Sequence, residues 1–145
     1  MRHHTVNSVW QTETMSEEMQ DWLKSRDSKE YFELLRMPTV GADPARLRDC
    51  VQAATWLKRW LGGIGAEAEL VLPERPSGEN SPVPVVVGER KGDGPSTVLF
   101  YGHYDVQPPD PLDQWESEPF SPTVKGDRVY ARGAQDDKGQ FFAFL

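Results

Sequence analysis

The most informative stretch of this sequence is Val98-Leu-Phe-Tyr-Gly-His-Tyr-Asp-Val-Gln-Pro108, in which an apolar run passes directly into polar residues. The run over Thr97–Tyr101 predicts a β-strand that is buried on both faces. Open α/β sheets bind ligands in the crevice beyond the carboxyl ends of their strands, so we expect the chemistry to begin where this strand ends. His103 and Asp105 follow it two positions apart. An extended backbone would point both side chains to the same face.

A second polar motif is Tyr130-Ala-Arg-Gly-Ala-Gln-Asp-Asp-Lys-Gly139, which follows a predicted hairpin over residues 124–130. The hairpin would deliver Asp136 to the end of the central strand. A carboxylate beside an imidazole fixes its tautomer and raises its basicity, as a metal-binding histidine requires. A lone His-x-Asp is more often a structural pair, and an isolated Asp-Asp-Lys-Gly is more often a solvated turn. The presence of both motifs together instead favours a metal site.

The chain resembles the di-zinc peptidase family that contains carnosine dipeptidases, succinyl-diaminopimelate desuccinylase and acetylornithine deacetylase. The resemblance is carried by three motifs in order, namely Gly102-His-Tyr-Asp-Val-Gln-Pro108, Trp115-Glu-Ser-Glu-Pro-Phe120 and the motif ending at Gly139. It extends roughly from Tyr31 to the end of the chain, and the first motif is most similar to the dipeptidase branch. One departure is Ala131, which stands where the family usually has a glycine before Arg-Gly.

Carried over by position, the resemblance implies a role for each candidate site residue. His103 would bind one zinc ion, and Asp136 would bridge two zinc ions. Asp105 would be the catalytic residue whose carboxylate orients His103. Manganese and cobalt are alternatives to zinc. The family commonly has a cis peptide bond after the bridging aspartate, which places the candidate bond between Asp136 and Asp137.

The implied activity is that of a metal-dependent dipeptidase or exopeptidase, which cleaves dipeptides or short peptides with a water activated by two zinc ions. An N-acyl amino acid deacylase or desuccinylase of the same family is the alternative enzyme. A catalytically silent truncated relative is the alternative from a different class. The resemblance also implies a small peptide substrate and a homodimer formed through a lid domain.

The family's glutamate general base, its further acidic ligands and its late histidine should all follow Asp136, and the sequence to Leu145 contains none of them. We therefore expect residues 16–145 to be the N-terminal part of a catalytic domain, without the lid domain, and to be inactive alone. Residues 1–15 lack hydrophobic periodicity and predict a disordered leader.

The predicted fold class is α/β, with helices packed on a mixed sheet around the central strand. Helix signals predict Ser16–Ser25, Ser28–Arg36 with Asp27 as its N-cap, and a third helix from Asp43-Pro44 to Gly62-Gly63. Alternation predicts strands over Ala66–Leu72 and Val83–Glu89, the latter paired with the central strand. The proline-rich segment Pro108–Pro122 predicts a stiff loop packed through its aromatic residues.

Composition excludes several classes of protein. The net charge of −7 argues against a nucleic-acid partner, because phosphate binding requires clustered lysine and arginine. No stretch approaches the ~18 apolar residues of a membrane span, and the N-terminus has no run that resembles a signal peptide. Cys50 is the only cysteine, which rules out an internal disulfide and favours a reducing, cytoplasmic compartment.

Overall fold

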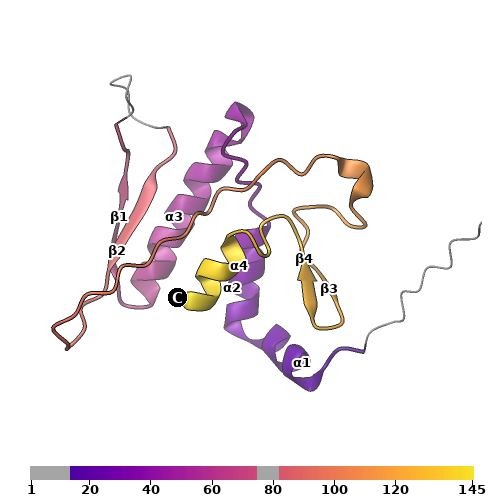
Figure 1. Cartoon of the computed structure of the whole chain (residues 1–145), viewed down its shortest axis with the longest axis horizontal. Coiled ribbons are helices and arrows are strands. Elements are labelled where there is room, and N and C mark those ends of the chain that lie inside the picture. Colours follow the sequence, from indigo (N-terminus) through magenta and orange to yellow (C-terminus); the bar gives the residue numbers. More distant parts are fainter. Residues whose placement is uncertain (1–13, 75–81) are drawn as a thin grey trace, which may run out of the picture.

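The computed structural model describes residues 14–74 and 82–145 (Figure 1). Its elements, in chain order, are α1 (Glu17–Lys24), α2 (Arg26–Leu35), the 3-10 turn η1 (Pro44–Arg46), α3 (Leu47–Gly63), β1 (Glu67–Val71), β2 (Val85–Glu89), the 3-10 turn η2 (Leu112–Gln114), β3 (Thr123–Lys125), β4 (Arg128–Tyr130) and α4 (Lys138–Phe144). Of the leader predicted over residues 1–15, residues 1–13 lie outside the described part of the chain.

The first two helices meet at Ser25. Ser16 caps α1 as predicted, because its hydroxyl accepts the backbone N–H of Met19. Ser25 caps α2 by accepting the N–H of Ser28, so the prediction of Asp27 as the cap was wrong. The reason is local: Ser25 has an extended backbone that ends one helix and begins the next, which leaves Asp27 in the first turn of α2.

The long helix α3 provides the surface on which the other elements pack. Asp43 accepts the N–H of Ala45 and caps the 3-10 turn η1, which leads directly into α3 at Leu47, and α3 ends at Gly63, as the sequence predicts. Its buried side chains are Cys50, Ala53, Ala54, Trp56 and Leu57. The hairpin of β1 and β2 also contacts α3, and Figure 1 shows it beside the helix.

The hydrophobic core lies between α2, α3 and α4. Phe141 of α4 joins a buried cluster with Leu34, Met37, Ala53, Trp56 and Leu57. Trp56 and Trp60 stack at a centroid distance of 6.3 Å, and Trp60 packs against the same cluster. The α4 helix is therefore anchored on residues that precede it by about a hundred positions.

The β-structure differs from the predicted mixed sheet. Two antiparallel pairs form within the described residues, β1 with β2 and β3 with β4. The predicted strand over Thr97–Tyr101 is not a strand here, and Leu99 is 93% exposed. Val85–Glu89 pairs with Glu67–Val71 instead of with this segment. An extended segment forms a strand only where a neighbouring strand receives its N–H and C=O groups, and none of the described strands pairs with Thr97–Tyr101.

The α/β class and the hairpin over 124–130 are confirmed. Among the described residues, no helix is both long enough and apolar enough to cross a membrane.

Candidate metal site

The structure brings together the three residues that the two sequence motifs nominate. The Nε2 atom of His103 lies 3.0 Å from Oδ1 of Asp136, although the two residues come from separate turns. On the other side of the ring, Nδ1 lies 3.1 Å from the carbonyl oxygen of Asp105 and 3.2 Å from its Oδ1. We call His103, Asp105 and Asp136 the metal half-site.

Both nitrogens of the His103 ring face oxygen acceptors. A neutral imidazole carries only one N–H, so one nitrogen would face a carboxylate without a proton between them. Burial alone would lower the pKa of His103. The carbonyl and carboxylate of Asp105, and the hydrogen bond that Asp136 accepts from the ring, have the larger combined effect and raise this pKa. The arrangement therefore calls for a positive charge between His103 and Asp136, from either a proton or a metal cation.

The donor set fits one part of a zinc site. Zinc binds imidazole nitrogen and carboxylate oxygen at about 2.0 to 2.2 Å, so two tetrahedral ligand atoms lie about 3.3 Å apart. The separation of 3.0 Å between His103 and Asp136 is within a few tenths of an ångström of that value. The Asp136 side chain is 78% exposed, so an ion can reach it. Within residues 14–74 and 82–145, no cluster of three or more histidine, cysteine or acidic side chains is arranged to hold a metal.

The backbone on the histidine side is held by the loop that follows α2. Thr39 is fully buried, and its hydroxyl donates to the carbonyl of Tyr104 at 2.6 Å. The N–H of Val106 donates to the carbonyl of Thr39 at 2.9 Å, next to a parallel bridge between Val40 and Val106. Because both contacts fall on residues flanking Asp105, they fix the course of the chain through the half-site.

The backbone on the aspartate side is held from three directions. The Asp136–Asp137 peptide bond is cis, as the resemblance implies. The Asp137 carboxylate accepts the backbone N–H of His103 at 3.0 Å, which links the two turns directly. Tyr31 donates its hydroxyl to the carbonyl of Ala134 at 2.6 Å, and burial raises the pKa of Tyr31 to about 12.

Lys138 is the third anchor, and it is fully buried. Its ammonium nitrogen lies 3.0 Å from the carbonyl oxygen of Leu34 and 2.8 Å from that of Met37. Burial lowers the pKa of Lys138 to about 7. Sequence reasoning did not nominate Thr39 or Lys138. A lysine beside two aspartates has the local composition of a solvated turn, so nothing nearby in the sequence marks its burial under α2.

The proline-rich loop between the two motifs is packed, as predicted. Trp115 donates its indole N–H to the carbonyl of Pro109 at 2.7 Å. The guanidinium carbon of Arg132 lies 5.1 Å from the centre of the Trp115 ring. The backbone N–H of Arg132 donates to the carbonyl of Pro119 at 2.7 Å. The loop is thus tied to the strand that leads to Asp136.

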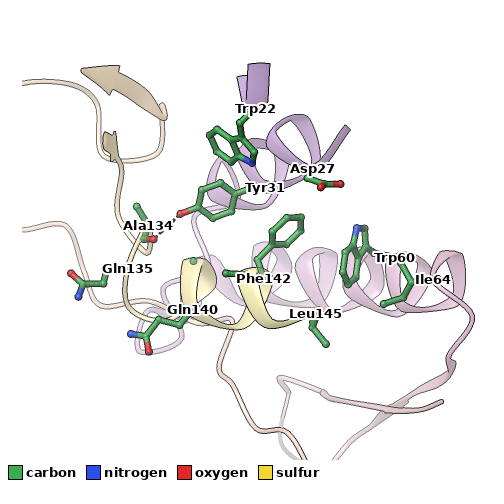
Figure 2. Close-up of a pocket in the computed structure, with 12 residues that line it drawn as sticks. Trp22, Asp27, Tyr31, Trp60, Ile64, Ala134, Gln135, Gln140, Phe142 and Leu145 are labelled. Atoms are coloured by element: carbon green, nitrogen blue, oxygen red, sulfur yellow. Dashed lines mark hydrogen bonds between the residues drawn. The ribbon is translucent and has the colours of Figure 1, made fainter. Parts of the chain in front are cut away.

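A cavity of about 620 Å³ lies beside α4, separate from the metal half-site. Figure 2 shows Trp22, Tyr31, Trp60 and Phe142 around it, with Tyr31 reaching towards Ala134. None of the three half-site residues lines this cavity. The half-site is instead an open surface, where the His103 side chain is 39% exposed.

Comparison with known proteins places this site in a family. The model of peptidase family M20/M25/M40 matches residues 99–145, which contain both motifs of the half-site. The chain is 36% identical over 115 residues to the Cys-Gly metallodipeptidase dug1 of Schizosaccharomyces pombe, covering 75% of this chain and 24% of that protein. It is 50% identical over 56 residues to succinyl-diaminopimelate desuccinylase of Thiobacillus denitrificans, covering 39% of this chain and 14% of that protein.

The fold agrees with these relatives. The crystal structure of human carnosine dipeptidase 1 superposes with a TM-score of 0.73 at 28% identity, covering 87% of this chain and 28% of that chain. The chain therefore spans about a quarter or less of the length of the curated relatives named here. The motifs, the fold and the paired His103 and Asp136 agree, and the chain belongs to the peptidase family M20/M25/M40.

Proposed function

We propose that the protein carrying this chain is a metal-dependent dipeptidase that hydrolyses dipeptides or short peptides. The observation that carries the proposal is the 3.0 Å approach of His103 Nε2 to Asp136 Oδ1, with Asp105 on the far side of the ring. Two nitrogens that both face oxygen acceptors form an arrangement suited to a cation. The dipeptidases among the relatives support the choice of substrate class.

We further propose zinc as the metal, with two ions in the complete site and manganese or cobalt as substitutes. When bound, such a pair supplies an activated water and polarises the scissile carbonyl. Asp105 holds the proton of His103 on Nδ1, which leaves the lone pair of Nε2 directed at Asp136. Asp136 has two carboxylate oxygens and is exposed enough to bridge two ions.

The half-site offers one imidazole and one bridging carboxylate. Within the described residues no third metal-binding side chain joins the pair, so a general base and the other ligands would come from elsewhere in the intact protein. We therefore expect the 145-residue chain alone to bind zinc weakly and to be inactive.

The test is a pair of substitutions in the intact protein that carries the chain. His103→Ala and Asp136→Ala should each abolish metal-dependent dipeptide hydrolysis, a loss of at least about a thousandfold in kcat/KM, and should weaken zinc binding measured by chelator competition. Asp113→Ala is the matched control, because Asp113 is an exposed carboxylate in η2, away from both motifs. Full activity in either half-site variant would refute the proposal.

An N-acyl amino acid deacylase is the second candidate. The 50% identity over 56 residues to a succinyl-diaminopimelate desuccinylase favours this second activity. Parallel assays of the intact protein with a dipeptide and with an N-succinyl amino acid distinguish the two. A preference of at least about tenfold in kcat/KM assigns the substrate class.

Two properties of the intact protein complete the proposal. We propose a cytoplasmic location, because Cys50 is the only cysteine and is fully buried as a free thiol. We propose a homodimer, which light scattering of the intact protein would detect as twice the monomer mass.

A further inference from the structure

We propose that the loop from Met37 to Gly41 is a clamp that holds the two halves of the metal site at a fixed separation, with Lys138 and Thr39 as positioning residues. Lys138 connects the loop to the turn that carries Asp136. Thr39 connects the same loop to the segment that carries His103. The effect on metal binding rests on the proposed function, whereas the geometry of the clamp does not.

The Lys138 arm of the clamp is unusual for a helix. Lys138 is the first residue of α4, where the positive end of the helix dipole makes a cation unfavourable. Burying an ammonium adds a desolvation cost. The contacts of the ammonium lie outside α4. It donates to the carbonyl of Leu34 in the last turn of α2 at 3.0 Å and to the carbonyl of Met37 just beyond that helix at 2.8 Å. The contact therefore fixes the turn at Asp136 against α2.

The Thr39 arm reaches the other half. Its hydroxyl and its carbonyl bind the backbone of Tyr104 and Val106, the residues on either side of Asp105. Gly41 completes this arm by close approach, because a Cβ there would lie 2.9 Å from Oδ2 of Asp105. A side chain at this position would displace the carboxylate that orients His103.

The two arms converge on one short segment. Met37 and Thr39 are two positions apart, and the N–H of Thr39 donates to the carbonyl of Met37 at 2.9 Å. The carbonyl that receives the Lys138 ammonium is therefore hydrogen-bonded to the residue that holds Tyr104. Movement of this segment would shift one half of the site relative to the other. Groups that support metal ligands from outside typically change metal affinity by about 10- to 100-fold when removed.

The first experiment measures the clamp without metal. In the intact protein, Lys138→Met and Thr39→Val keep side-chain size but remove the donated hydrogen bonds. We expect the amides of His103 and Val106 to exchange with deuterium at least about tenfold faster than in the wild type. Thr39→Ser keeps the hydroxyl and should restore slow exchange. Thr55→Val is the matched control, because it removes a threonine hydroxyl bonded to Val51 on the exposed face of α3.

The second experiment measures zinc affinity by chelator competition in the same variants. Lys138→Met and Thr39→Val should weaken zinc binding by about 10- to 100-fold, and Thr55→Val should leave it unchanged. Thr39→Ser keeps the hydroxyl that bonds to Tyr104 and should keep the wild-type affinity.

The outcomes separate the clamp from the proposed function. If the wild-type protein binds no zinc but the variants exchange these amides faster than it does, the clamp is supported and the metallopeptidase proposal is refuted. Tight zinc binding by the wild type, with unchanged affinity and unchanged exchange in Lys138→Met and Thr39→Val, overturns the clamp and leaves the proposed function standing.

Discussion

Two apolar segments flank the metal half-site, and they differ in how far they are packed. Val98–Tyr101 precedes His103, whereas the apolar residues of α4 follow Asp136. Leu99 is 93% exposed, but Phe141 is only 5% exposed and belongs to the core cluster. Composition alone does not separate the two segments. The difference lies in whether the partner of each segment is present among the described residues.

A helix and a strand satisfy their backbones in different ways. The N–H of Phe141 donates to the carbonyl of Asp137 within the same segment, so α4 needs only a surface for its side chains. An extended segment needs a second strand for every N–H and C=O group. The only bridge near Val98–Tyr101 in the described structure joins Val106 to Val40 beyond its end. The segment just before His103 therefore has no strand partner in the described structure, and its packing rests on side chains such as Phe100, which stacks on Phe144 at 4.0 Å.

The largest expected effect comes from truncating one side chain in each segment. Phe141→Ala should lower the free energy of unfolding by about 3 to 5 kcal/mol, because it leaves a cavity between α2, α3 and α4. Leu99→Ala should change it by less than about 0.5 kcal/mol, because an exposed side chain loses no packing. Urea denaturation of the 145-residue chain measures both.

Equal losses in the two variants would contradict the comparison. They would mean that Leu99 is covered in solution, either by another part of the chain or by a second copy. A shift of the Leu99→Ala midpoint with protein concentration would identify the second copy.

The helices could be predicted from the sequence because their signals are local. Ser16 and the Asp43-Pro44 pair mark starts that the structure confirms, and the Gly126 turn predicts the hairpin of β3 and β4. Pairing of strands is not local. Glu67 pairs opposite Glu89, although residues 72–84 separate the two strands along the chain. The shorter segment 91–96 has the composition of a hairpin turn but does not form a hairpin.

The second prediction compares glycines in the two regions. A Cβ at Gly139 would lie 1.9 Å from the carbonyl oxygen of Ala134 and 2.9 Å from the Tyr31 hydroxyl, so the turn at Asp136 would have to shift. Gly139→Ala should cost about 3 kcal/mol of stability, at the upper end for overpacking. Gly92→Ala, in the loop that leads to Val98, meets nothing within 4 Å and should be tolerated.

Thermal unfolding of the two variants checks this prediction. A Tm for Gly139→Ala within a degree of the wild type would show that the turn is not packed as tightly as Tyr31 and Ala134 indicate. Since that packing places the Asp136 carboxylate near His103, zinc affinity in the intact Gly139→Ala protein should fall together with stability.

The sequence could predict that His103, Asp105 and Asp136 come together, but it could not predict the contacts that support them. His103, Asp105 and Asp136 have side chains whose chemistry is visible in the motif itself. Thr39 and Lys138 act on backbone carbonyls, and any residue type has such a carbonyl. No pattern in the partner sequence therefore marks these contacts. They follow from the path of the chain, which brings residues about a hundred positions apart into contact.

The smallest expected effect depends on pH and compares one tyrosine from each region. Tyr31 is buried and donates to Ala134, and its pKa is raised to about 12, whereas Tyr101 is exposed. An unfolded tyrosine titrates near 10, so between pH 10 and 12 the folded protein holds a proton that the unfolded chain has lost. The stability contributed by Tyr31 is therefore complete below pH 10 and is lost as the pH rises towards 12.

Two pKa units correspond to a loss of roughly 2 to 3 kcal/mol over this range, which is an upper limit. Tyr31→Phe should remove this part of the alkaline loss, although it should also lower stability at pH 8 by about 1 kcal/mol through the missing hydrogen bond. Tyr101→Phe is the matched control, because the Tyr101 side chain is 83% exposed, and it should keep the wild-type slope. Urea midpoints from pH 8 to 12 give the slopes. If Tyr31→Phe and the wild type lose stability in parallel, then the Tyr31 hydroxyl does not hold the Asp136 turn, and that turn depends on Asp137 and Lys138 alone.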